Sequence, residues 1–262
     1  MFKLLQSHTT EPEIRAENIA ARTDVGLVRE HNEDDYLYIA IPGESAVLCV
    51  VTDGMGGHDG GELASYFTTE SLFKIWTSQD KGFESKAKET EELIAKCIQK
   101  INYKVFSINN FLGIDRPMGT TVTAALFTPG KVTLFQVGDS RCYLWRENHL
   151  QQLTEDQTLV ARMVRHGTIS EAEAKNHPLS HLLSNCLGSS DYLPIDITHH
   201  KRRPGDRFLV CSDGLYGSMG FDDIKRTLSK HPSPSFAINE LFELAFRGGG
   251  KDNITAILVF DK

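Results

Sequence analysis

The sequence predicts an α+β fold in which antiparallel β-sheets are layered against helices. Segments with strand character occur in runs rather than in strict alternation with helices, and those over 119–148 form a β-meander with short turns. Such grouping favours antiparallel sheets, since a parallel sheet needs a long crossover between successive strands. The 262 residues contain no internal repeat or low-complexity linker. We therefore expect one folded domain over 23–262, preceded by an arm over 1–22 that is weakly structured or an edge strand.

In the first half of the chain, strands precede helices. The apolar segments DDYLYIAI and SAVLCVVTD predict strands, with the turn PGES between them. Apolar residues then recur at a helical period over 61–76 and over roughly 87–110. The segments GTTVTAALF and KVTLFQVGDSRCYLWREN alternate and are rich in β-branched and aromatic residues, so they predict the meander.

Between 154 and 200 the pattern is looser. DQTLVARMVRHG and SEAEAK predict short helices, the second with Ser170 as its N-cap, and Pro178 follows as a helix breaker. We interpret the basic segment THHKRRPGD as a solvated strand end. A strand follows in DRFLVCSDG, helices are expected near 220–230 and in SPSFAINELFELAFRGG, and NITAILVFD predicts the last strand.

Composition excludes several classes of protein. The net charge is −7, which argues against nucleic acid or an anionic membrane surface as a partner. No stretch approaches the roughly 20 apolar residues that span a bilayer, and the first residues lack the core of a signal peptide. The five cysteines are odd in number and show no C-x-x-C spacing. We therefore expect a cytoplasmic protein without a disulfide framework or zinc site.

Four aspartates stand at the ends of apolar strands. Asp53 follows VLCVVT, Asp139 follows VTLFQVG, Asp213 follows FLVCS, and Asp252 directly precedes the last strand. Aspartate is disfavoured in strands, so propensity does not explain the pattern. An Asp-Gly pair at a strand end is also a common turn signal, and taken singly each of these positions is better explained as a turn.

Together the four acids suit a metal site. Carboxylates on rigid strands match the oxygen ligands that Mg²⁺ and Mn²⁺ prefer. The glycines after Asp53 and Asp213 are expected to let a metal, its waters or a ligand approach the backbone. Two cations about 3.5–4 Å apart can share a bridging water and direct it at phosphorus or a carbonyl carbon. The pattern alone does not distinguish between these reactions.

The order of the motifs adds a family resemblance. From about Thr23 to Phe260 the sequence resembles the metal-dependent protein serine/threonine phosphatases of type 2C (the PPM family), especially their compact bacterial members. Eight segments carry the resemblance: TDVGLVREHNEDDYL, VVTDGMGGHDGGELAS, MGTTVTAALF, FQVGDSRCYLW, LTEDQTLV, HPLSHLLSNCLGS, PGDRFLVCSDGLYG and DNITAILV. The resemblance implies a four-layer αββα sandwich, with two antiparallel sheets flanked by helices and a dinuclear Mn²⁺ or Mg²⁺ centre at one edge.

The resemblance also implies roles for single residues. The metal ligands would be Asp53 as the bridging carboxylate, the Gly54 carbonyl, Asp213 and Asp252. Further positions are implied around them: Asp34 holding metal-bound water, Asp139 binding a weaker third metal with Asp213, Glu33 and Asn253 beside the ligands, and Arg29 binding the phosphate. Catalysis would depend on Arg29, Asp53 and Asp213. We assign Arg141 a structural role, such as neutralising Asp139.

Two positions depart from the family pattern. Met55 stands where some members carry a histidine that is interpreted as a general acid, and nearby His58 is given no proton-transfer role. Gln157 stands where the family usually shows the histidine of an Asp-His pair, and glutamine does not titrate. Residues 155–185 correspond to the flap of the family, a segment beside the site that influences substrate choice.

These expectations define an enzyme that hydrolyses phosphoserine and phosphothreonine on proteins, with a hydroxide bridging two divalent metals as the nucleophile. The resemblance further implies phosphorylated protein substrates and an opposing serine/threonine kinase in a bacterial cytoplasm, and we expect a monomer. Two alternatives remain open at this point. One is a catalytically weak pseudo-phosphatase that binds phosphoproteins, and the other is a phosphatase of small phosphate esters.

Overall fold

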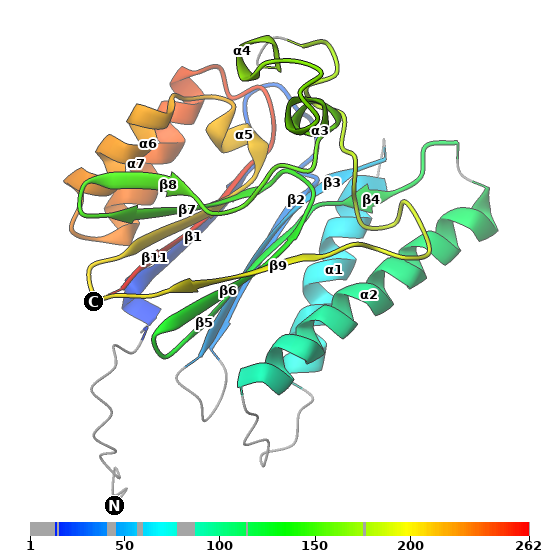
Figure 1. The fold of residues 1–262 in the computed structure, drawn as a ribbon, viewed down its shortest axis with the longest axis horizontal. Coiled ribbons are helices and arrows are strands. Elements are labelled where there is room, and N and C mark those ends of the chain that lie inside the picture. Colours follow the sequence, from blue (N-terminus) through cyan, green and yellow to red (C-terminus); the bar gives the residue numbers. More distant parts are fainter. Residues whose placement is uncertain are drawn as a thin grey trace, which may run out of the picture.

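Two antiparallel β-sheets lie face to face, and helices cover both outer faces (Figure 1). The structure is a computed structural model that describes residues 14, 16–40, 46–56, 60–77, 87–113, 115–174 and 177–261. The four layers confirm the αββα sandwich. Within these ranges no helix combines the length and the apolar character that crossing a membrane requires.

One sheet has five strands. Their spatial order is β1 (Ile19–Asp24), β11 (Ile254–Phe260), β10 (Arg207–Cys211), β7 (Arg141–Arg146) and β8 (His149–Gln152). All neighbouring strands are antiparallel. The strand β1 therefore forms one edge of this sheet, beside the strand that comes last in the chain.

The other sheet has six strands. Five follow the order β2 (Asp34–Ala40), β3 (Val47–Met55), β5 (Val122–Thr128), β6 (Lys131–Val137) and β9 (Asp196–Lys201), and the short β4 (Gly119–Thr120) pairs with β3. The strand β9 includes part of the segment THHKRRPGD, and most of its residues are exposed at the sheet edge. The solvated strand end predicted for this segment is confirmed for most of its residues, but it is wrong for Arg202 and Asp206, which are buried.

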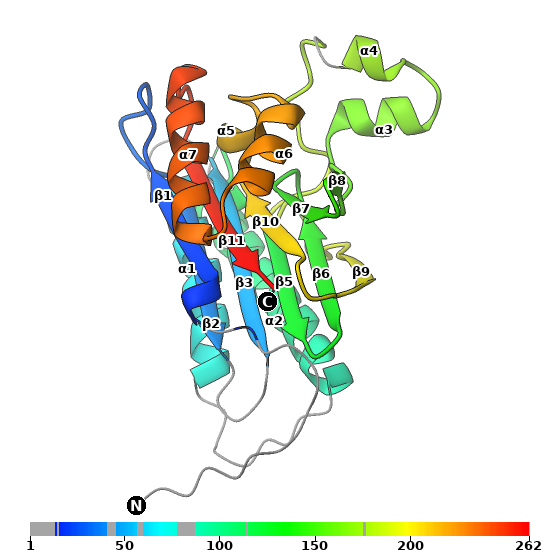
Figure 2. The same ribbon diagram turned by 90° about the vertical axis from the view of Figure 1, so that its left-hand side faces the viewer.

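The helices divide between the two outer faces. On the six-stranded sheet lie α1 (Gly60–Thr77) and α2 (Ala87–Leu112). On the five-stranded sheet lie α6 (Phe221–Lys230) and α7 (Pro234–Arg247), with the one-turn α5 (Asp213–Tyr216) at one end. A 3-10 turn (Ala16–Asn18) precedes β1. The helices α3 (Leu159–Arg165) and α4 (Glu171–Ala174) project from the same end of the sandwich at which α5 lies (Figure 2).

The strand β3 shows how the sequence divides the core. Leu48 and Val50 belong to the cluster under α1 and α2, whereas the alternate residues Val47, Cys49 and Val51 belong to the cluster between the sheets. A strand that is buried on both faces reads as a continuous apolar run, as VLCVV does. Burying each such side chain stabilises the fold by roughly 1.5–3 kcal/mol.

Most element boundaries agree with the sequence analysis. Both long helices begin within one residue of their expected starts. At α4, Ser170 Oγ accepts the Glu173 N–H at 3.3 Å and Glu173 Oε2 accepts the Ser170 N–H at 2.7 Å, which confirms the predicted cap. The expected turn PGES and residues 1–13 of the expected arm lie outside the described residues.

Candidate metal centre

Five aspartates converge at one end of the sandwich, and we call Asp34, Asp53, Asp139, Asp213 and Asp252 the acid cluster. Asp34 and Asp53 lie directly opposite each other on β2 and β3. Burial raises the pKa of Asp53 well above its usual range, and the negative charges of the other four acids raise it further. Four of these acids, Asp53, Asp139, Asp213 and Asp252, were expected together from the apolar strand ends, and Asp34 was expected from the family resemblance.

Two other members of the cluster, Asp34 and Asp139, are buried. Burial raises the pKa of Asp34 to about 7, against the lowering effect of hydrogen bonds from Ser212 and Thr255. Burial, together with the charges of Asp213 and Asp156, raises the pKa of Asp139 to about 7. A raised pKa means that the charged form of the carboxyl group is destabilised. A cation nearby would stabilise that charged form.

Asp53 is held by its main chain in the interior of a strand. The expected strand end at Asp53 is wrong, because β3 continues to Met55 by exchanging its partner β5 for β4. The Asp53 N–H donates to Thr121 Oγ1 at 3.0 Å, and the Asp53 carbonyl accepts from Thr120 Oγ1 at 3.0 Å and from the Thr121 N–H at 2.9 Å. These bonds fix the carboxylate on a rigid support.

The two Asp-Gly glycines allow backbone to approach backbone. A Cβ at Gly54 would lie 2.2 Å from the Gly61 carbonyl oxygen and 2.6 Å from that of Glu33, and a Cβ at Gly214 would lie 2.0 Å from the Asn253 carbonyl oxygen. The space that a Cβ would occupy at each glycine is therefore filled by a neighbouring carbonyl, while the approach of a metal or its waters to these glycines stays a prediction. Their physical role is to bring acid-bearing segments together.

Asp213 is not a strand residue, because β10 ends at Cys211 and Asp213 is the first residue of α5. Burial raises its pKa, and the charge of Asp252 raises it further. Ser212 Oγ donates to Asp34 Oδ2 at 2.7 Å and accepts the Thr255 N–H at 3.0 Å. Ser212 thus joins three segments of the site. Ser212 is not among the predicted site residues. It stands at the N-cap position of α5, but its side chain makes no capping hydrogen bond, so a cap signal does not reveal this role.

Arg29 contacts the cluster from the solvent side. Its Nη2 lies 2.8 Å from Asp252 Oδ2, and half of its side chain is exposed. This is the one ion pair that we find for the acid cluster among the described residues. An exposed arginine can exchange one anionic partner for another at small cost, since surface ion pairs contribute about 0–1 kcal/mol.

Asn253 fastens the loop that carries Arg29. Its Oδ1 accepts the Glu33 N–H at 2.8 Å, and its Nδ2 donates to the carbonyls of Val25 and His31, each at 2.9 Å. The Asn253 side chain is buried. Glu33 and Asn253 thus lie beside the cluster, as expected. The Asn253 side chain holds the main chain of the Arg29 loop in place.

Arg141 has a different partner from the one that we suggested. Its Nε and Nη2 donate to the two carboxylate oxygens of Asp156 at 2.9 and 2.6 Å, and its guanidinium lies 3.6 Å from the centre of the Tyr216 ring. Arg141 makes no direct ion pair with Asp139, but its positive charge lowers the pKa of Asp139, which supports the neutralising role that we suggested. A bidentate, stacked arginine of this kind is held in place by its neighbours. His58 lies outside the described residues.

The donor set fits hydrated divalent cations. Carboxylate oxygens are the ligands of Mg²⁺ and Mn²⁺, and the cluster carries five acids against one paired arginine. Among the described residues, no three His, Cys, Asp or Glu side chains are arranged to hold a metal ion by themselves.

Comparison with known proteins identifies the family. The family model described as "Protein phosphatase 2C" matches residues 27–252. The chain belongs to the protein phosphatase 2C family. It is 34% identical over 238 residues to the serine/threonine phosphatase stp of Listeria monocytogenes, covering 91% of this chain and 93% of that protein.

A second relative is longer than this chain. The chain is 36% identical over 242 residues to the serine/threonine protein phosphatase PstP of Mycobacterium tuberculosis. That match covers 91% of this chain and 44% of PstP, so the chain spans less than half the length of this relative.

Solved structures of bacterial phosphatases share the fold. A serine/threonine phosphatase of S. agalactiae superposes with a TM-score of 0.87 at 30% identity, covering 93% of this chain and 99% of that one. The catalytic domain of PstP, solved with two manganese ions, superposes with a TM-score of 0.76 at 33% identity and covers 93% and 98% of the two chains. Both structures support the architecture expected from the family resemblance.

Proposed function

We propose that this chain hydrolyses phosphoserine and phosphothreonine esters on proteins. The observation that carries the proposal is the acid cluster, in which buried and partly exposed carboxylates lie together and a half-exposed arginine stands at the rim. A scaffold protein gains nothing from such a cluster, since uncompensated buried acids destabilise a fold. This argues against the alternative of a pseudo-phosphatase.

In this proposal the cluster holds two divalent cations, Mn²⁺ or Mg²⁺. Asp53 would bridge them, the Gly54 carbonyl, Asp213 and Asp252 would complete the protein ligands, and Asp34 would hold coordinated water. Asp139 would hold a weaker third cation with Asp213. When bound, the cations supply Lewis acidity and lower the pKa of water. The two manganese ions in the PstP catalytic domain support this assignment.

Arg29 binds the phosphate of the substrate. A planar guanidinium can donate to two phosphoryl oxygens at once, which an ammonium group cannot do. Arg29 leaves Asp252 for the phosphate, and its exposed position makes the exchange inexpensive. Asn253 holds the loop of Arg29 against the start of β11, so the backbone that carries Arg29 keeps its position relative to the acid cluster while the side chain changes partner.

The rest of the site supplies rigid positions rather than proton transfer. Met55 has no titratable group, so the leaving oxygen of serine or threonine cannot receive its proton from this residue. Ser212 orients the Asp34 carboxylate, and Thr121 anchors the main chain of Asp53. Catalysis would therefore come mainly from positioning and neutralisation of charge.

The biological setting belongs to the same proposal. Phosphorylated proteins would be the substrates, a serine/threonine kinase would act in opposition, and the enzyme would work in the cytoplasm as a monomer. Residues 23–262 would form the phosphatase domain, and the segment 155–185, with α3 and α4, would act as its flap. The position of these helices at the same end of the sandwich as α5 supports an influence on substrates that reach the acid cluster.

The first test is hydrolysis of p-nitrophenyl phosphate with Mn²⁺, with Mg²⁺ and with chelator. Asp53→Asn should abolish metal-dependent turnover. The matched control is Asp222→Asn, which makes the same change at an exposed residue of α6 and should leave turnover unaltered. Absence of turnover by the folded wild type with every metal would overturn the proposal.

The substrate class needs a second assay. Phosphoserine and phosphothreonine peptides should be hydrolysed with higher kcat/KM than small phosphate esters of similar charge. An enzyme that shows no preference for any peptide would instead be a phosphatase of small esters.

A further inference from the structure

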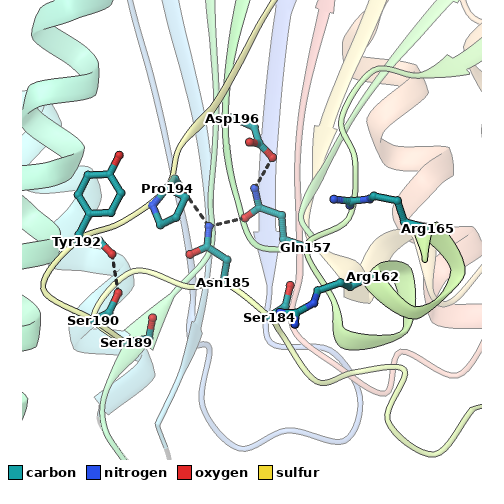
Figure 3. A pocket seen from close by; sticks show the side chains of 10 residues that line it. All are labelled: Gln157, Arg162, Arg165, Ser184, Asn185, Ser189, Ser190, Tyr192, Pro194 and Asp196. Atoms are coloured by element: carbon teal, nitrogen blue, oxygen red, sulfur yellow. Dashed lines mark hydrogen bonds between the residues drawn. The ribbon is translucent and has the colours of Figure 1, made fainter. Parts of the chain in front are cut away.

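A pocket of about 490 Å³ lies between α3 and the segment that leads to β9 (Figure 3). Ten residues line it: Gln157, Arg162, Arg165, Ser184, Asn185, Ser189, Ser190, Tyr192, Pro194 and Asp196. Gln157 is the buried member of this set, with 9% of its surface exposed. Its amide points toward Asn185 and Asp196 in Figure 3.

Gln157 uses both ends of its side chain. The Oε1 atom accepts the Gly138 N–H and the Asn185 Nδ2–H, each at 2.8 Å, while Nε2 donates to Asp196 Oδ2 at 2.7 Å. Its main chain adds two bonds, from the Gln157 N–H to the Gly138 carbonyl at 3.0 Å and from the Ser184 N–H to the Gln157 carbonyl at 2.8 Å.

These bonds join the flap to the acid cluster. Gln157 and Ser184 stand at the two ends of the flap, and Gly138 directly precedes Asp139. Gly138 has a φ of +92°, and a Cβ there would lie 2.6 Å from Thr121 Cγ2, so the turn packs closely on Thr121. Thr121 in turn accepts the Asp53 N–H. A displacement of Gln157 would therefore reach Asp139 directly and Asp53 through Thr121.

We propose that Gln157 is a positioning residue that fixes the turn of Asp139 and the base of the flap relative to each other. The inference rests on the proposed phosphatase activity. A neutral amide suits this position because it accepts from the Gly138 N–H and donates to the Asp196 carboxylate at the same time. A carboxylate at position 157 could accept from Gly138 but would meet Asp196 as a like charge.

The test exchanges the amide of Gln157 and the carboxylate of Asp196. Gln157→Glu places two carboxylates together, and Asp196→Asn keeps a side-chain oxygen that can accept from Gln157. The double variant Gln157→Glu/Asp196→Asn restores a hydrogen bond with donor and acceptor reversed. Gln151→Glu makes the same change at an exposed position of β8 and serves as the matched control.

Two readouts are needed, and one is independent of catalysis. Hydrogen exchange is measured on the metal-free protein in peptides that contain Gly138 and Ser184, with a peptide from β11 as the reference. Steady-state kinetics then give kcat and KM separately. The substrate is p-nitrophenyl phosphate, because this small molecule does not need the pocket.

In Gln157→Glu, exchange should rise at Gly138 and Ser184 but not in β11. The loss of one charge-assisted hydrogen bond predicts a fall in kcat of roughly tenfold, with KM changed less than about twofold. The double variant should recover both readouts, and the variants Asp196→Asn and Gln151→Glu should resemble the wild type.

Three results would overturn the proposal: wild-type exchange and kcat in Gln157→Glu, failure of the double variant to recover, or a rise in exchange that includes β11 equally. The last would mean general destabilisation. If the wild type hydrolyses no phosphate ester, the proposed function fails, and the exchange data still decide whether Gln157 holds the turn.

Discussion

The two ends of β10 and β11 both carry aspartates, but they balance the charge differently. At one end Asp261 lies 2.6 Å from Arg202, and Asp206 accepts two hydrogen bonds from Arg146 at 2.7 and 2.6 Å. At the other end Asp213 and Asp252 join three further acids, and Arg29 is the arginine that pairs with them. One end is compensated by the chain itself, whereas the other carries an excess of negative charge.

The difference shows which buried acids indicate function. Burial alone does not, since Asp206 and Asp261 are more completely buried than Asp252. A protein can neutralise a buried carboxylate with arginine when structure is all that is required. An acid cluster without such arginines carries uncompensated negative charge, and a bound cation can neutralise it. Variants at the two ends can therefore separate a functional from a structural role.

The largest effect is expected from Asp213→Asn. The amide removes one charge from the proposed metal ligands, and kcat should fall about thousandfold, which corresponds to ~4 kcal/mol. The metal-free protein should remain folded, because the change relieves repulsion among buried acids. Kinetics and thermal unfolding of the same sample check both statements. Turnover within threefold of the wild type would remove Asp213 from the catalytic machinery.

Asp261→Asn is expected to lower the stability of the fold and to leave kcat unchanged. Arg202 would lose its carboxylate partner in a fully buried position, at a cost of about 3 kcal/mol in the free energy of unfolding. The kcat of the folded fraction should be unchanged, since the pair lies at the far end of the strands. Urea unfolding and initial rates test this prediction. A loss of kcat without a loss of stability would break the proposed contrast between the two ends.

Metal addition should stabilise the folded protein, and this effect should depend on the acid cluster alone. At a Mn²⁺ concentration one hundred times the Kd, linkage predicts about 2.7 kcal/mol of added stability. A domain of this size would then gain roughly 5 °C in Tm, and chelator should reverse the gain. Asp261→Asn should respond like the wild type, and Asp213→Asn should respond much less. Equal gains in both variants would place the cation elsewhere.

The smallest effect concerns Glu91, an acid surrounded by donors. Burial raises its pKa, but hydrogen bonds from Lys131, His199 and Thr133 outweigh this and leave the pKa lowered. A group whose pKa is lowered by folding stabilises the folded state at pH values above its unfolded-state pKa. This stabilisation is lost as the pH falls through its folded-state pKa. Glu91→Gln should therefore cost about 1 kcal/mol at pH 7 and less in acid. A cost that is independent of pH would contradict this prediction.

Much of the fold follows from local sequence patterns. The alternation in β3, the helical periods of α1 and α2 and the cap at Ser170 each depend on neighbours in the chain, and the structure agrees with them. The convergence of the acids could also be anticipated, because strands of two stacked sheets end at a common edge.

Other features depend on contacts between distant segments. The end of β3 was misplaced because β4, more than sixty residues later, extends the pairing to Met55. The roles of Gly54 and Gly214 become visible once the carbonyls of Gly61 and Asn253 are in place. The choice of Asp156 by Arg141 likewise reflects tertiary geometry, since Asp139 is nearer in sequence. Periodicity and propensity carry no information on such contacts.

The pairing of β1 with β11 has a consequence for synthesis of the protein. The hydroxyls of Thr23 and Thr255 meet at 2.7 Å across 232 residues of chain. Loop closure over such a distance is slow, and the five-stranded sheet cannot be completed until β11 has left the ribosome. Asp252 arrives with that strand. A nascent chain should therefore acquire its acid cluster in one late step, and a ribosome-bound chain that lacks β11 should be inactive toward phosphate esters.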